Sequence, residues 1–237
     1  MFNKHVALIC GPSKAGKSTS LRNLENVLYA NCEAGKQLPF KANNFKEIII
    51  TDPLQMTEFL THYEDTDGYS MAVIDGLNYL MNMYESNHVR NSANTMSAWG
   101  DYAEYFKELM QQQVAALTKP IIFTAHVETI YNESSMEMET KVPVKGSTKS
   151  IGIESFFTTV VMAKKVKVTD LEEYQNDLLN ITDRDKKVGY KHVFQTMVTA
   201  DTVNTRISTP MGMFSDSETY IDNDVELLLQ RMNEYYA

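Results

Sequence analysis

Runs of apolar residues, separated by polar stretches rich in turn-forming residues, divide this chain into predicted strands and helices. The apolar runs predict strands at residues 5–10, 27–31, 47–50, 70–76, 121–126, 158–168 and 191–199, and a short one at 206–208. Helix-start signals and apolar positions at three- and four-residue spacing predict helices at 17–25, from 53 onward, at 98–117 and at 225–235. Strands that alternate with helices indicate an α/β fold, with a mainly parallel sheet and helices on both faces. The consecutive strands near the C-terminus predict an antiparallel extension of that sheet.

The stretches between these elements are predicted to lie on the surface. Residues 86–97 are rich in Asn and Ser, which is typical of a loop. Residues 128–150 are polar without a clear period and predict either a long loop or a mobile hairpin. The highly charged stretch 170–187 predicts a surface excursion.

Length and composition limit the class of protein. The chain has 237 residues, which predicts a single domain over 1–237 with a sizeable core. It contains no apolar run of about 18 residues, so no membrane span is expected. Cys10 and Cys32 both lie at the ends of predicted strands and show no metal-ligand spacing. Two unpaired core thiols fit a reducing compartment, and we expect a cytoplasmic protein.

The most informative motif lies between the first predicted strand and the first predicted helix. Residues 11–18 fit the pattern G-x-x-x-x-G-K-[ST], the phosphate-binding P-loop. Its glycines let the backbone wrap closely around a phosphate, and free N–H groups at the following helix start would point at the anion. We therefore predict ATP as the ligand, bound by Gly11, Pro12, Ser13, Lys14, Ala15, Gly16, Lys17, Ser18 and Thr19.

Two oxygen ligands for Mg²⁺ are expected beside this loop. Lys17 offers a positive charge to the outer phosphates, and Ser18 offers a hydroxyl to the metal. Asp75 ends the apolar run 71–74, which is the position of the acid that holds Mg²⁺ together with the P-loop serine. The alternative is that Asp75 only caps a turn at the strand end.

Two further polar residues end predicted strands at the same edge of the sheet, where ligands bind in parallel α/β folds. Glu33 follows the strand 27–31 and is predicted to orient or deprotonate the attacking water, although a solvated loop glutamate is equally compatible with its position. His126 ends the strand 121–126 and is predicted to contact the γ-phosphate or the water and to report the nucleotide state to the next loop. The alternative for His126 is a buried histidine satisfied by backbone groups.

The order of these segments resembles a known family. Four features in this order are similar to the RecA-like ATPase core. They are the P-loop, the sequence Leu-Tyr-Ala-Asn-Cys-Glu at 28–33, the acid at 75, and Phe-Thr-Ala-His at 123–126 followed by a long loop. Within it, the chain resembles the phage recombinases of the single-strand annealing group. The resemblance implies a catalytic role for Lys17, Glu33 as the catalytic glutamate, His126 as a γ-phosphate sensor, and Arg206 as a residue supplied to the nucleotide of a neighbouring subunit.

The resemblance also implies partners. Residues 86–97 and 128–150 correspond to two DNA-contacting loops, and a homo-oligomer in the form of a ring or filament is expected. The net charge of −9 argues against a broad DNA-binding surface, so contact must be local. Lys145 and Lys149 are the expected phosphate contacts, and Tyr131 is a candidate for stacking on a base. A single-strand binding protein is a candidate further partner.

Three functions are therefore compatible with the sequence. The first is an ATP-hydrolysing phage-type recombinase that binds single-stranded DNA and promotes annealing or strand exchange. The second is a P-loop kinase acting on a small molecule, which the scarcity and scatter of arginine disfavour. The third is a nucleotide-gated DNA- or protein-binding module with little turnover.

Overall fold

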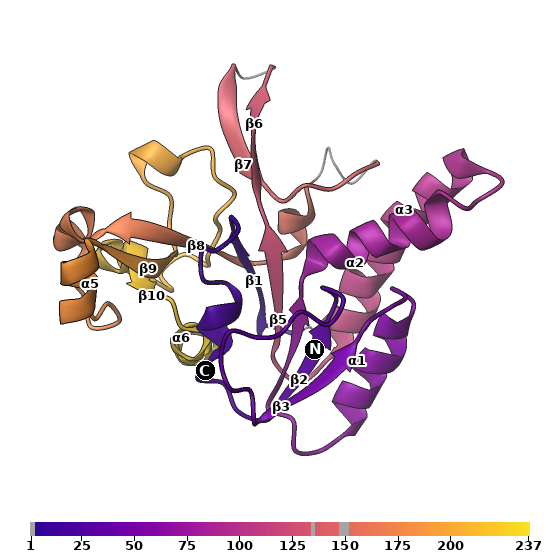
Figure 1. Ribbon diagram of the computed structural model, residues 1–237, viewed down its shortest axis with the longest axis horizontal. Helices are drawn as coiled ribbons and strands as arrows, with labels where there is room; N and C mark the ends of the chain where they lie inside the picture. Colours follow the sequence, from indigo (N-terminus) through magenta and orange to yellow (C-terminus); the bar gives the residue numbers. More distant parts are fainter. Residues whose placement is uncertain (1–2, 134–135, 147–151) are drawn as a thin grey trace.

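Strand β1, Val6–Gly11, lies inside an eight-stranded sheet and leads directly into the P-loop (Figure 1). The computed structural model describes residues 3–133, 136–146 and 152–237. The strands follow one another in the order β10-β9-β8-β1-β5-β4-β2-β3. Their bounds are β2 Val27–Asn31, β3 Phe45–Ile49, β4 Met71–Asp75, β5 Ile121–His126, β8 Thr159–Lys167, β9 Tyr190–Gln195 and β10 Tyr220–Asp222.

The pairing of the strands confirms the predicted mixed sheet. β1 pairs in parallel with β5 and β8, and β2 pairs in parallel with β3 and β4. β4 pairs in parallel with β5, whereas β9 runs antiparallel to both β8 and β10. The parallel strands therefore end at one edge, and the antiparallel extension lies beyond β8.

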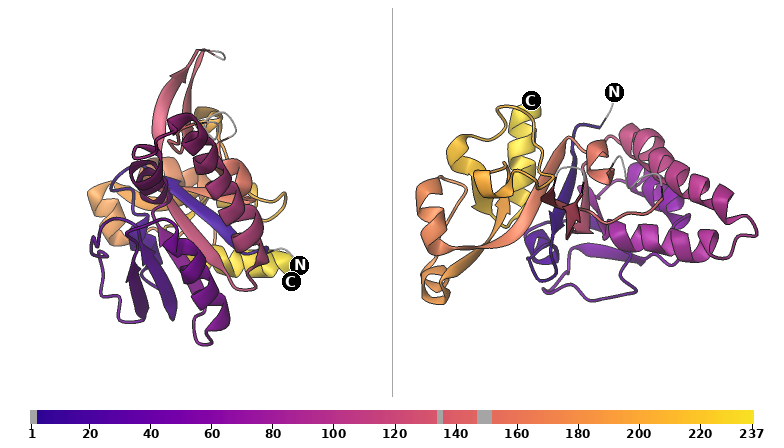
Figure 2. Two further views of the ribbon diagram at one scale, coloured as in Figure 1. Left: turned by 90° about the vertical axis from the view of Figure 1, so that its right-hand side faces the viewer. Right: turned by 90° about the horizontal axis from the view of Figure 1, so that it is seen from above.

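Helices cover both faces of the sheet (Figures 1 and 2). One face packs against α1, Gln55–Asp65, α2, Leu77–Tyr84, and α3, Thr95–Glu108, in a core that includes Phe123 and Phe106. The other face packs against α6, Val225–Tyr236, in a second core. Alternate residues of β1 divide between the two cores, as expected of a strand that is buried on both faces.

The segment after the P-loop differs from the prediction. Instead of a helix at 17–25, only a 3-10 helix forms at Ser18–Leu21. The chain has to enter β2 at Val27 and turns through Asn26, which has a φ of 55°. In addition, the Arg22 guanidinium donates to the backbone oxygen of Asn223 at 2.7 Å. Tertiary contacts thus override local helix propensity here.

The predicted loop at 86–97 is also shorter than expected. A π-helical turn at Glu85–Val89 continues α2, and α3 already begins at Thr95, where the Asn94 side chain accepts a hydrogen bond from the Ser97 N–H at 3.2 Å. Only residues 90–94 therefore lie outside helical structure. A further π-helical turn, Leu109–Val114, extends α3. The Asn- and Ser-rich composition reflects a helix cap as much as a loop.

The polar stretch after β5 forms a hairpin, one of its two predicted forms. β6, Glu128–Asn132, pairs antiparallel with β7, Glu137–Lys141, and the pair projects from the body of the molecule (Figures 1 and 2). The charged stretch 170–187 contains a short helix, α5, Asp183–Val188, on the surface. Within the described ranges, no helix combines the length and the apolar character that crossing a membrane requires.

Candidate nucleotide-binding site

The P-loop adopts a backbone path that requires glycine at two positions. Gly16 has a φ of 102°, a conformation that residues with a Cβ rarely adopt. Gly11 lies so close to β8 that a Cβ on it would be 2.5 Å from the backbone oxygen of Ala163. The loop therefore begins in close contact with β8, and its backbone has a positive φ at Gly16, directly before Lys17.

Lys17 is buried inside this loop, with 7% of its surface exposed. Its ammonium donates to the backbone oxygens of Gly11 and Pro12 at 2.7 and 2.9 Å. Burial lowers the pKa of Lys17 to about 8, although the nearby carboxylate of Asp75 acts in the opposite direction. Lys17 is thus a buried cation whose partners are two backbone carbonyl groups. A phosphate can take the place of these carbonyl groups.

Asp75 lies beside the P-loop at the end of β4 and is 3% exposed. Its Oδ2 accepts hydrogen bonds from Ser18 Oγ at 3.0 Å and from the Tyr29 hydroxyl at 2.8 Å, and Thr124 donates to Oδ1. Tyr29 and Thr124 orient the carboxylate toward Ser18. A hydroxyl and a carboxylate at hydrogen-bond distance fit Mg²⁺, which takes few protein ligands and completes its shell with phosphate and water.

Glu33 and His126 lie close to Lys17 and to each other. His126 Nδ1 is 3.3 Å from the Lys17 ammonium, and its Nε2 is 3.7 Å from Glu33 Oε1. Burial, followed by the positive charge of Lys17, lowers the pKa of His126, so the ring is neutral at pH 7. With Lys17 donating to Nδ1, the ring proton is assigned to Nε2, which faces Glu33. Glu33 also forms an ion pair with Lys36.

The structure therefore brings together the P-loop, Glu33, Asp75 and His126 at the carboxyl edge of the parallel strands, as the sequence predicts. Their catalytic roles stay predictions. Asn78, in the first turn of α2, joins the group without having been predicted: its Oδ1 accepts from the His126 N–H at 2.6 Å and its Nδ2 donates to the Pro143 oxygen at 3.4 Å. No pattern in the sequence singles out Asn78, whereas Thr124 interrupts an apolar run and offered a signal.

Arg206 lies outside this group. Its guanidinium donates to Glu139 Oε1 at 2.9 and 2.7 Å and to Glu154 Oε2 at 3.2 Å. Hydrogen bonding to Arg206 holds the pKa of Glu139 below its usual value. In a single chain Arg206 thus fastens β7 to the body of the molecule, and its predicted role toward a neighbouring subunit is not tested by these contacts.

The predicted DNA-contacting residues are spread over the hairpin and the segment after it. Tyr131 in β6 is 56% exposed, so its ring is available for stacking. Lys145 Nζ forms an ion pair at 2.7 Å with the buried carboxylate of Glu85, which also binds Arg90 at 3.0 Å. Lys149 lies outside the described residues. The Lys145 contact ties the segment after the hairpin to the end of α2.

The fold and this group of residues define a P-loop nucleotide-binding ATPase domain. The chain matches the family model described as an AAA domain over residues 3–203 and belongs to that family. AAA domains generally use ATP and Mg²⁺, in agreement with the chemistry of Lys17, Ser18 and Asp75. A search of curated proteins finds no match.

Proposed function

We propose that this chain hydrolyses ATP and uses the nucleotide state to control binding of single-stranded DNA as a homo-oligomer. The observation that carries the ATPase proposal is the contact of His126 with both Lys17 and Glu33, at 3.3 and 3.7 Å, beside the pair of Ser18 and Asp75. The groups that phosphoryl transfer to water requires lie around one phosphate-binding loop: a cation, a neutral imidazole and a carboxylate.

In the proposed reaction Glu33 accepts a proton from the attacking water, whose oxygen forms a bond to the γ-phosphorus. The bond from that phosphorus to the β-phosphate oxygen breaks, and ADP leaves with the electron pair. Lys17 balances the negative charge on the outer phosphates, and Ser18 and Asp75 would hold Mg²⁺, which supplies further positive charge when bound. The neutral His126 ring donates from Nε2 toward the water or the γ-phosphate oxygen.

The proposed coupling to DNA uses the chain that follows His126. Asn78 bonds both the backbone of His126 and that of Pro143, on either side of the hairpin. A shift of His126 toward a phosphate would therefore act on both ends of this segment. The proposed DNA contacts are Tyr131 on the exposed hairpin, Lys145 and Lys149. One chain offers few such contacts, so useful affinity would come from an ATP-assembled oligomer.

In such an oligomer Arg206 is the proposed in-trans residue. Its guanidinium would have to exchange Glu139 and Glu154 for the phosphates of a neighbouring subunit's ATP. Both partners are carboxylates, so the exchange replaces one set of charge-assisted hydrogen bonds with another. Assembly would then release β7 of the hairpin at the same moment that it completes the neighbour's site.

The test is an ATPase assay of the purified chain with Mg²⁺, with and without a single-stranded oligonucleotide. Stimulation by the oligonucleotide supports the proposal. Turnover that depends on a small-molecule acceptor instead would assign the chain to the P-loop kinases. Tight ATP binding without turnover would assign it to nucleotide-gated binding modules.

A further inference from the structure

Asn31 is a fully buried polar residue at the end of β2, two positions before Glu33. It follows the apolar run 27–30, and none of its surface is exposed. Burying a polar group costs free energy unless hydrogen bonds compensate for the lost water. The contacts of the Asn31 carboxamide therefore show which part of the molecule it supports.

These contacts close the turn that carries Glu33. Asn31 Oδ1 accepts a hydrogen bond from the Glu33 N–H at 2.9 Å, and Nδ2 donates to the backbone oxygen of Lys36 at 3.1 Å. The Lys36 N–H in turn donates to the Glu33 oxygen at 3.2 Å. One buried side chain thus holds both ends of the turn 33–36.

The backbone inside this turn follows a path that needs such support. Ala34 and Gly35 have φ values of 55° and 80°. Ala34 carries a Cβ, and a residue of this kind keeps a left-handed conformation only where its surroundings hold it there. The Glu33 side chain on this turn is 10% exposed, and its Oε1 lies 3.7 Å from His126 Nε2. The shape of the turn therefore determines where the Glu33 carboxylate lies.

A carboxylate on the neighbouring strand sets the orientation of the Asn31 amide. Glu47 Oε1 in β3 accepts from Asn31 Nδ2 at 2.6 Å. An ionised carboxylate can only accept, so it selects the donor side of the amide and leaves Oδ1 for the Glu33 N–H. An aspartate at position 31 would have no donor, and it would add a negative charge beside Asp75, its partner in register on β4. A neutral amide is therefore the group that fits this position.

We propose that Asn31 is a positioning residue for ATP hydrolysis, which fixes the turn 33–36 so that the Glu33 carboxylate faces the attacking water. The inference rests on the proposed function, because Asn31 acts through Glu33. Within the described parts of the chain, the hydrogen bonds of the Asn31 side chain go to Glu33, Lys36 and Glu47 and not to the P-loop. Loss of the amide should therefore slow hydrolysis and leave ATP binding unchanged.

A double-mutant cycle tests this, with the wild type, Asn31→Ala, Glu33→Gln and the double variant. Calorimetry gives the affinity for ATP, and a steady-state assay with Mg²⁺ gives kcat. Asn31→Ala should keep the ATP affinity and lower kcat about 10- to 100-fold, because misplacing a reacting group by about 1 Å can cost about 10²-fold. In the Glu33→Gln background the same substitution should lower kcat no further. A merely structural role would lower kcat in both backgrounds.

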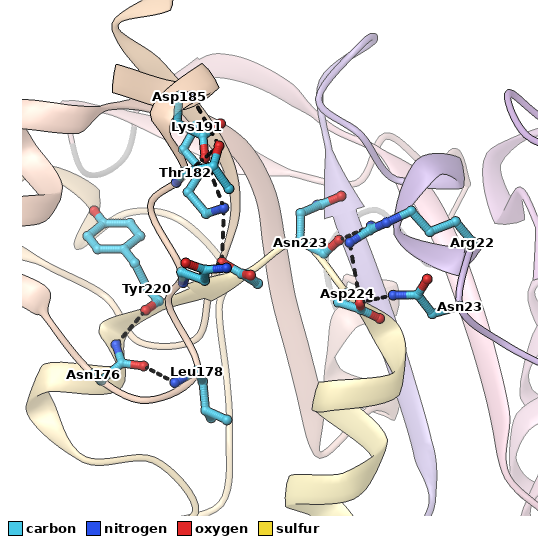
Figure 3. Close-up of polar contacts among 12 residues, drawn as sticks. Arg22, Asn23, Asn176, Leu178, Thr182, Asp185, Lys191, Tyr220, Asn223 and Asp224 are labelled. Atoms are coloured by element: carbon cyan, nitrogen blue, oxygen red, sulfur yellow. Dashed lines mark hydrogen bonds and ion pairs between the residues drawn. The ribbon is translucent and has the colours of Figure 1, made fainter. Parts of the chain in front are cut away.

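Asn176→Ala is the matched control for the loss of a turn-closing amide. Asn176 Oδ1 also accepts from the N–H two residues later, that of Leu178 at 2.8 Å, and its Nδ2 donates to the Tyr220 oxygen at 2.9 Å (Figure 3). This turn lies beside β10 and outside the nucleotide site, so kcat should stay at the wild-type value.

Glu47→Leu is a second test that leaves Asn31 in place. It removes the acceptor that orients the amide, and Glu47 is exposed, so the core is unchanged. This variant should lower kcat by a smaller factor than Asn31→Ala, again without an effect on ATP affinity and without a further effect in Glu33→Gln. If Asn31→Ala does not fold, the cycle of Glu47→Leu with Glu33→Gln decides.

Two results would overturn the inference and leave Glu33 as the proposed base: wild-type kcat in Asn31→Ala, or an equal loss of kcat in both backgrounds. Weaker ATP binding with an unchanged kcat would also overturn it, because Asn31 would then support the nucleotide and not the water. Turnover that does not depend on Glu33 overturns the proposed reaction itself, so the two failures are distinguishable.

Discussion

The ammonium of Lys17 and the imidazole of His126 are 3.3 Å apart, which joins the P-loop on β1 to the carboxyl end of the neighbouring strand β5. The contact is possible because Gly11 and His126 are paired in register across the two strands. The contact joins Lys17, the cation for the phosphates, directly to His126, the residue that is predicted to sense them. A phosphate that draws Lys17 away from the loop carbonyls therefore also changes the surroundings of His126.

Replacing Lys17 should separate function from stability. Lys17→Met should abolish ATP hydrolysis and weaken ATP binding, because the outer phosphates lose their cation. Burial lowers the pKa of Lys17, so the folded protein disfavours this charge relative to water. The midpoint of thermal unfolding at pH 7 should therefore be equal to or higher than that of the wild type. Turnover at the wild-type rate would contradict the assignment of the nucleotide site.

The affinity for MgATP should fall as the pH rises through about 8, the pKa of the buried Lys17 in the free protein. The affinity falls because the phosphates bind the protonated ammonium of Lys17. Above that pH the free protein has to take up a proton at Lys17 in order to bind MgATP. The dissociation constant should rise by up to about tenfold per pH unit. Calorimetry in two buffers of different ionisation enthalpy at pH 8.5 measures the proton uptake, and its absence would contradict the buried-cation account.

Arg206→Ala should leave ATP binding by one chain intact and lower turnover at protein concentrations that allow assembly, as loss of an arginine finger does. Wild-type chains mixed into the variant should restore part of the activity. Glu139→Gln is the matched control, because it weakens the same intrachain ion pair, which Arg206 Nη2 makes at 2.7 Å, and keeps the guanidinium. Equal effects of the two substitutions would show that Arg206 only fastens the hairpin.

Lys145→Ala combined with Lys149→Ala should lower the affinity for single-stranded DNA and flatten its salt dependence by about 0.7 in the logarithmic slope per lost phosphate contact. ATP binding should be preserved. Glu85→Gln is an informative control, because it removes the carboxylate that Lys145 contacts at 2.7 Å and should raise the affinity for DNA. Fluorescence anisotropy of a labelled oligonucleotide with ATP and Mg²⁺ measures the DNA affinity of both variants. If the double variant binds DNA as tightly as the wild type does, this segment is excluded as the DNA site.

The sequence predicted the sheet and the edge of the site because both follow from local patterns. Apolar runs predicted each strand of the eight-stranded sheet except β10, whereas the strand predicted at 206–208 forms only an isolated bridge between Ser208 and Val160. Glu33, Asp75 and His126 were found from their positions after or at the ends of such runs. The short 3-10 helix after the P-loop was not predictable, because it depends on Arg22 reaching Asn223, far along the chain.

Contacts between distant segments also explain the residues that were missed. Asn78 acts through the backbones of His126 and Pro143, and the Asn31 carboxamide is oriented only when β3 brings Glu47 beside it. Neither contact is part of a motif. The intrachain partners of Arg206 likewise appear only when the hairpin folds back, because Glu139 belongs to β7.

The most direct test of the central claim measures ATP binding and ATP turnover side by side in the wild type and in Glu33→Gln. Glutamine keeps the size of the side chain but cannot accept the proton of the attacking water. We predict that Glu33→Gln binds ATP as the wild type does and that its turnover falls by about 10²–10⁴, the contribution of a general base. Turnover within about a factor of two of the wild type, far below that range, would contradict the account, because the water would then be activated by another group.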